Sequence, residues 1–152
     1  MPDPTRVHLT RLDAYRFRAD FGDPAIQPLQ VDESPPLGKG AGPSPTRLLA
    51  TALAQCLSSS LIFCLGKSRV EVGKLESEAN VTLVRNERNR VRVGRVDVVL
   101  RPELPGAAPE QVQKCLELFE DFCVVTASVR QGLTVGVKVL SGDGRVLNER
   151  AD

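Results

Sequence analysis

Four cysteines are the residues of this chain best suited to covalent chemistry, and their spacing limits what they can do. Cys56 and Cys64 are eight residues apart, and so are Cys115 and Cys123. Eight residues of helix rise about 12 Å, so neither pair can form a disulfide within one helix. No Cys-x-x-Cys motif occurs, which excludes the thioredoxin motif and the usual zinc sites. The cysteines are therefore either reactive thiols or small hydrophobic core residues.

Two of the cysteines have surroundings that favour reactivity. Cys56 lies in the middle of a predicted helix, among small side chains that leave room for a ligand to reach its sulfur. Cys123 lies at a predicted helix start, where free N–H groups and the helix dipole favour a thiolate. Cys64 lies in an apolar run and Cys115 on an apolar helical stripe, so both are predicted to be core residues.

The elements that carry these cysteines alternate between hairpins and helices. A helix of residues 44–66, with Ser44-Pro45 at its start, is apolar nearly all round, and a partner subunit is one way to cover it. The order of elements favours an α+β fold with antiparallel sheets over a doubly wound parallel sheet. The other predicted elements are strands over 6–21 and 26–31, a loop over 32–45, a hairpin with strands over 75–83 and 91–100 and a bulge at Gly94, a linker over 102–109, helical segments over 110–122 and 123–132, a strand over 133–139 and a loosely ordered polar tail from Ser141.

Composition narrows the class of protein. With 152 residues, 41% hydrophobic and 26% charged, the chain has the size and composition of one globular domain. Twenty basic against 19 acidic residues, and no Trp, argue against nucleic acid as a partner. No secretory signal is visible, and the uncharged stretch 48–66 fits a buried helix better than a membrane span. We therefore expect a cytoplasmic protein that binds no membrane.

The sequence predicts no bound cofactor or metal. The glycines of residues 38–42 lack the third glycine of the dinucleotide-binding fingerprint. A single histidine, His8, excludes the common multi-histidine metal sites.

Two segments resemble the signatures of the OsmC/Ohr-type proteins, named for osmotic induction and organic hydroperoxide resistance. Residues 42–56, GPSPTRLLATALAQC, are similar to the family's helix segment, which reads (G/N)-P-(x-P)-x-E-L-L-x-A-A-x-x-x-C. Residues 123–128, CVVTAS, followed by Gly132 and an alternating strand, resemble its second signature, C-P-V-S-x-x. The separation of 67 residues between Cys56 and Cys123 also fits.

This resemblance implies a fold and a reaction. The fold is an OsmC-like domain over residues 1–152, with a core over 6–140 and a polar tail over 141–152, in an intertwined homodimer. The implied reaction is thiol-dependent reduction of a small organic hydroperoxide. Cys56 is then the peroxidatic cysteine and Cys123 the resolving one, with a Cys56–Cys123 disulfide that an external dithiol or lipoyl-type reductant reduces.

The chain departs from the family pattern where the pattern bears on thiol chemistry. Family peroxidases place a Glu ten residues before the first cysteine, where it hydrogen-bonds an Arg that lowers the thiol pKa; here Thr46 stands instead. Val124 replaces the Pro that follows the second cysteine. Family peroxidases draw their Arg from the N-terminal hairpin region, which favours Arg18 over Arg16. Asp32 and Glu33, in the loop before the helix, are candidate substitutes for the missing Glu.

Two other functions remain open on the sequence alone. A noncatalytic, ligand-binding OsmC-like dimer is favoured by the absence of the Glu, and an ordinary thiol pKa near 8.5 at Cys56 would support it. A structural or partner-binding domain with incidental cysteines is the third possibility, and it is consistent with the balanced charge.

Overall fold

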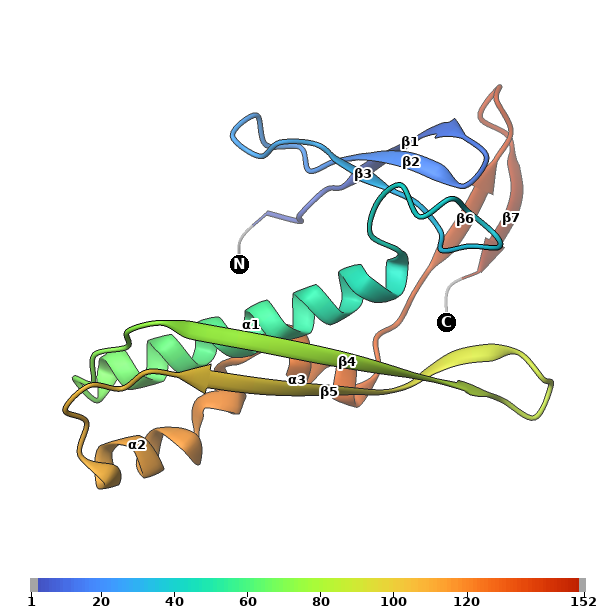
Figure 1. Ribbon diagram of the computed structural model, residues 1–152. Coiled ribbons are helices and arrows are strands. Elements are labelled where there is room, and N and C mark those ends of the chain that lie inside the picture. Colours follow the sequence, from blue (N-terminus) through green and yellow to red (C-terminus); the bar gives the residue numbers. More distant parts are fainter. Residues whose placement is uncertain (1–2, 151–152) are drawn as a thin grey trace. The chain divides into compact units, whose positions relative to one another are not determined.

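The computed structural model describes residues 3–150 as a mixed α+β chain whose paired strands are all antiparallel (Figure 1). Its contacts divide it into two compact units. The first unit comprises residues 3–55 and 74–102, and the second comprises residues 56–73 and 103–150. The long helix α1 (Pro45–Lys67) contributes to both units. The predicted fold class, α+β with antiparallel sheets and one long helix, is confirmed.

The first unit begins with a three-stranded sheet in the order β1-β2-β3. Its strands are β1 (His8–Asp13), β2 (Arg16–Asp20) and β3 (Leu29–Val31). The prediction of one strand over 6–21 was wrong, because the chain turns at Ala14, where φ is 37°. No glycine or proline marks this turn, so it could not be recognised from the usual turn residues. The strand predicted over 26–31 is shortened to β3.

A long hairpin completes the first unit. It pairs β4 (Leu75–Arg85) with β5 (Val91–Pro102). Thr82 pairs with Arg95 and Leu83 with Val93, so Gly94 is the extra residue and the predicted bulge is confirmed.

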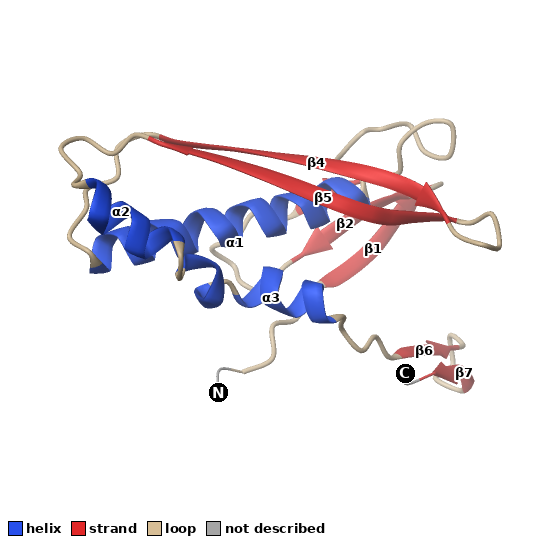
Figure 2. Cartoon of the chain, turned by 90° about the horizontal axis from the view of Figure 1, so that it is seen from below, coloured by secondary structure: helices blue, strands red, loops and turns tan. Residues whose placement is uncertain are grey.

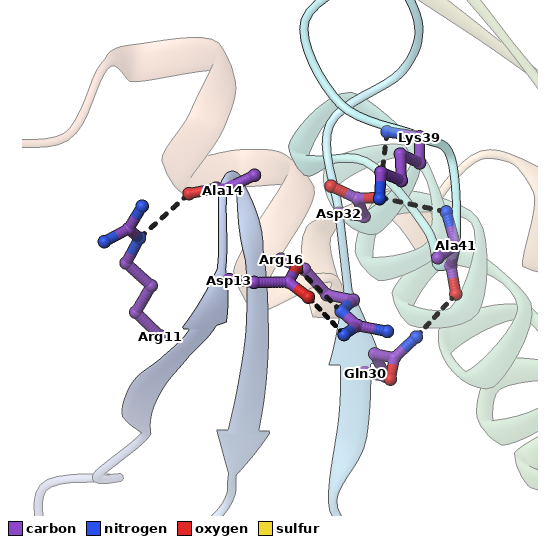
Figure 3. Close-up of polar contacts among 8 residues, drawn as sticks. All are labelled: Arg11, Asp13, Ala14, Arg16, Gln30, Asp32, Lys39 and Ala41. Carbon is purple, nitrogen blue, oxygen red and sulfur yellow. Dashed lines mark hydrogen bonds and ion pairs between the residues drawn. The ribbon is translucent and has the colours of Figure 1, made fainter.

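The loop between β3 and α1 is organised by one carboxylate. Asp32, only 4% exposed, accepts backbone N–H hydrogen bonds from Lys39 and Ala41 at 3.1 Å each (Figure 3). It accepts a further one from the Glu33 N–H at 2.8 Å. The bond from Ala41 contributes most to a lowered pKa of Asp32, and it outweighs the opposing effect of burial. A buried carboxylate thus takes the place of regular backbone pairing in this loop.

Acid should weaken the fold through this carboxylate. Because the pKa of Asp32 is lower when folded than its ordinary 3.8, its contribution is fully present above that value and is lost as pH falls through the lowered pKa. We expect Asp32→Asn to lower the urea midpoint of unfolding at pH 7. Below about pH 4, the midpoint of this variant should decrease less with falling pH than that of wild type. Asp23→Asn, at an exposed turn, is the control. Equal acid sensitivity in wild type and Asp32→Asn would contradict this assignment.

Helix α1 starts and stops as the sequence predicts. Its first residue is Pro45, and the Ser44 carbonyl accepts the Leu48 N–H at 3.0 Å. After Lys67 the chain turns through Arg69, whose φ is 57°. Apolar residues at helical spacing bury one face of α1: Ala50, Leu53, Leu57, Leu61 and Leu65. By length and composition the helix could also span a bilayer, a test that the core helices of soluble proteins pass as well.

The second unit packs short helices against the C-terminal half of α1 (Figure 2). These are α2 (Pro109–Leu116), the 3-10 turn η1 (Phe119–Phe122) and α3 (Val124–Gln131). The Gln111 side chain donates to the Ser68 carbonyl at 3.0 Å. The rings of Phe122 and Phe63 pack edge to face, with their centroids 5.5 Å apart. The helical pattern predicted over 110–122 breaks after Leu116, because helical spacing alone does not distinguish one helix from two short ones.

The C-terminal segment is a hairpin of β6 (Val137–Leu140) and β7 (Val146–Arg150). The predicted strand over 133–139 therefore begins later, at Val137. A polar tail was predicted from Ser141, where the structure instead has a turn, with Gly144 at φ 86°, followed by β7. The prediction was wrong here because a short exposed strand that ends in three polar residues resembles a loose tail in composition.

Candidate functional site

The two cysteines with the more reactive surroundings lie together in the second unit. The sulfurs of Cys56 and Cys123 are 2.7 Å apart, and both residues are free thiols. Cys56 lies in the middle of α1, and Cys123 is the residue at which α3 begins, since its carbonyl accepts the Ala127 N–H at 3.0 Å. A disulfide bond of about 2.05 Å requires only a small further approach of the two sulfurs.

The two sulfurs differ in exposure. Cys123 is fully buried at 0% exposure, whereas Cys56 is partly exposed. A small molecule in solution therefore reaches the sulfur of Cys56 first.

The surroundings of Cys123 lower the pKa of its thiol. Burial is the largest single influence on Cys123 and by itself would raise its pKa. The hydrogen bonds that join the Cys123 sulfur to Cys56, to the Thr126 hydroxyl at 3.0 Å and to Ser60 outweigh it, so the pKa of Cys123 is lowered. The sulfur at the start of α3 is thus the more acidic of the two.

Cys56 has the opposite tendency. Burial, followed by its hydrogen bond to Cys123, raises the pKa of Cys56. The backbone N–H groups of Val125 and Thr126, in the first turn of α3, hydrogen-bond the Cys56 sulfur and favour its charged form. Of the two thiols, Cys123 is therefore the one that loses its proton more readily, and N–H donors are already placed for charge that moves to Cys56.

Sequence reasoning did not single out Ser60 or Thr126 as site residues. Ser60 is one helical turn beyond Cys56, and Thr126 lies three residues after Cys123, in the first turn of α3. The sequence feature that could have identified them is a hydroxyl side chain three or four residues after a candidate cysteine, on the same helical face. Both side chains are buried against the thiol pair.

The predicted core cysteines are confirmed as buried. Cys64 is 6% exposed and Cys115 is 1% exposed. Burial, with the side-chain hydrogen bond between Cys115 and Cys64, raises the pKa of Cys115 to about 12. At neutral pH Cys115 is therefore a thiol and not a nucleophile.

The charged residues considered from the sequence lie in the first unit. Arg18 is exposed on β2, and a carboxylate oxygen of Asp20 lies 4.0 Å from its guanidinium group. Arg16 is engaged more closely, donating to both carboxylate oxygens of Asp13 at 3.1 and 2.5 Å (Figure 3). Asp32 directs both of its oxygens at backbone N–H groups. Among residues 3–150, no cluster of three or more His, Cys, Asp or Glu is placed to hold a metal ion.

The chain belongs to the OsmC-like protein family, whose model matches residues 38–138. Its fold is similar to that of an OsmC-like protein of unknown function from Vibrio cholerae, with 16% identity, a TM-score of 0.71 and coverage of 83% of this chain and 93% of the other. An OsmC-like protein from Mycoplasma pneumoniae gives 13% identity, a TM-score of 0.72 and coverage of 88% and 91%. The organic hydroperoxide resistance protein of Bacillus subtilis gives 20% identity, a TM-score of 0.57 and coverage of 84% and 90%. No curated protein matches the chain.

Proposed function

We propose that this protein reduces small organic hydroperoxides with the Cys56–Cys123 dithiol. The approach of the two sulfurs to 2.7 Å carries the proposal, because a dithiol at that separation can pass through a sulfenic acid to a disulfide without rearrangement of the fold. Two similar structures bear the name organic hydroperoxide resistance protein, which supports this substrate class.

The first step oxidises Cys56. In the reactive form Cys123 is the thiolate, and the Cys56 proton moves across the S···S contact to Cys123 as the hydroperoxide reaches the partly exposed Cys56. The Cys56 thiolate, held by the N–H groups of the α3 start, attacks the distal peroxide oxygen and gives it two electrons. The O–O bond breaks and Cys56 becomes a sulfenic acid. The alkoxide takes the proton from Cys123 and leaves as the alcohol.

The second step closes the disulfide. Cys123, once more a thiolate, attacks the sulfenic sulfur of Cys56 and expels hydroxide. Two thiol–disulfide exchanges with an external dithiol then restore both thiols and release the dithiol as its own disulfide. A lipoyl-type dithiol suits this step because its second thiol closes a ring. No bound cofactor takes part, and the reducing cytoplasm is the compartment that supplies such thiols.

Arg18 is the proposed source of the positive charge that assists Cys56. It is less tightly engaged with a carboxylate than Arg16 is, so it is the more available of the two guanidinium groups. We expect Arg18→Gln to lower the second-order rate with hydroperoxide about tenfold or more, since a nearby cation lowers a thiol pKa by at least about one unit. Arg16→Gln is the matched control, on the same strand. Equal rates in the two variants would remove Arg18 from the site.

A homodimer is the proposed assembly. Large apolar side chains stand exposed on the second unit, including Ile62 at 48%, Phe63 at 51% and Val124 at 76%. A second subunit would remove this surface from water. Sedimentation at the mass of a single 16.5 kDa chain would argue against it.

A noncatalytic OsmC-like protein is the second candidate. The raised pKa of Cys56 and the presence of Thr46 in place of the family Glu both favour it. Hydroperoxide consumption by wild-type protein with a dithiol distinguishes the two, because the noncatalytic protein consumes none beyond the uncatalysed rate.

A further inference from the structure

A second pair of thiols lies in the second unit and takes no part in the proposed reaction. Cys64 is on α1, and Cys115 is near the end of α2. The Cys64 sulfur lies 3.6 Å from the Cys115 carbonyl oxygen, and the Cys115 sulfur lies 4.0 Å from the Leu61 carbonyl oxygen, one turn before Cys64. The two thiols also hydrogen-bond each other. Each cysteine thus lies against the backbone that carries the other.

We propose that Cys64 and Cys115 form a second dithiol–disulfide site, which small-molecule disulfides oxidise by exchange and which links α2 covalently to α1. The two side chains come from different helices and can therefore reach each other. Cysteines eight residues apart on one helix are too far apart for a disulfide. Within residues 3–150, no third His, Cys, Asp or Glu joins the two sulfurs to complete a metal site.

The burial of this pair selects the oxidant. Cys115 is 1% exposed and its pKa is about 12, so its thiol reacts poorly with a peroxide. Exchange proceeds instead when α2, a helix of eight residues, moves away from α1. The Cys64 thiolate attacks a small disulfide and releases one small thiol. Cys115, after losing its proton to solvent, displaces the second small thiol and forms the Cys64–Cys115 bond, so that the small disulfide gains the two electrons.

The second site acts independently of the first. Cys56 and Cys64 are separated by eight residues of α1, a rise of about 12 Å, which keeps the two pairs from direct exchange. The loop from 64 to 115 lies within the loop from 56 to 123, so both disulfides together give two nested crosslinks between α1 and the short helices. An oxidising environment would therefore stabilise the second unit further.

The test uses the full chain with Cys56→Ser and Cys123→Ser, which leaves only the second pair. After incubation with oxidised glutathione and alkylation under denaturing conditions, we expect an intact mass lower than that of the reduced protein by two hydrogens, with no alkyl label. The thermal midpoint should rise by several degrees. The matched control adds Cys64→Ser. In this variant we expect Cys115 to form no internal disulfide and the thermal midpoint to stay unchanged after treatment with oxidised glutathione.

Three results would overturn the proposal: two alkylated cysteines, a persistent glutathione adduct on Cys64, or crosslinking between chains on a nonreducing gel. If the double variant does not fold, wild-type protein treated in the same way is digested with a protease. A peptide joining Cys64 to Cys115 then supports the proposal, and its absence contradicts it. Neither arm uses a hydroperoxide, so the outcome is separate from that of the proposed peroxidase reaction.

Discussion

Cys56→Ser is expected to abolish hydroperoxide consumption, with a loss on the order of a thousandfold or more relative to wild type. Serine keeps the size of the side chain but its hydroxyl is a far weaker nucleophile toward peroxide oxygen. The partly exposed Cys56 thiol next to the α3 N–H groups is lost, and the buried Cys123 sulfur does not replace it. Cumene hydroperoxide consumption in the presence of dihydrolipoamide measures the effect.

Cys123→Ser should behave differently. Cys56 can still react once, but no thiolate 2.7 Å away then closes the disulfide. We expect one rapid turnover followed by accumulation of sulfenic and then sulfinic acid on Cys56, visible as added oxygen in the intact mass.

Cys64→Ser is the matched control for both variants, since it also replaces a cysteine of α1 and leaves the reacting pair intact. Its consumption rate should stay near that of wild type. Equal consumption by wild type and Cys56→Ser would refute the peroxidase proposal. No consumption by wild type would favour the noncatalytic alternative.

Gly42→Ala is expected to destabilise the protein by about 3 kcal/mol. A Cβ atom at this position would lie 2.2 Å from the Gln30 carbonyl oxygen and 3.0 Å from the Val31 Cα atom. Both atoms belong to the backbone of β3, so no side-chain rotation relieves the overlap. The loop that leads to α1 must move, and its hydrogen bonds to Asp32 and Gln30 weaken with it.

Gly66→Ala is the control, and its expected change in the free energy of unfolding has the opposite sign. Gly66 is helical, in the last turn of α1, and a Cβ there meets nothing within 4 Å. Alanine should therefore stabilise the protein by about 0.5 kcal/mol, since it restricts the unfolded chain more than glycine does. Urea unfolding of both variants measures the difference, and a neutral Gly42→Ala would show that the loop yields freely.

Local patterns were sufficient for the elements whose boundaries have strong chemical markers. Ser44-Pro45 predicted the start of α1, and the phase shift at Gly94 predicted the bulge in the long hairpin. The turn at Ala14 was missed because neither glycine nor proline marks it. The strand β7 was missed because three of its five residues are polar. In these cases pairing with a neighbouring strand decided the structure, and that partner is not visible in a local window.

The sequence by itself determined the reactive residue type, the helices that carry the four cysteines, and the likeness to the OsmC/Ohr-type proteins. Only the tertiary structure decided which thiols meet, because the partners are 67 and 51 residues apart in the chain. It also decided which of the two thiols is the more acidic. A thiol pKa depends on burial and on the donors within hydrogen-bond distance, and Ser60 and Thr126 reach Cys123 only after α3 has packed against α1.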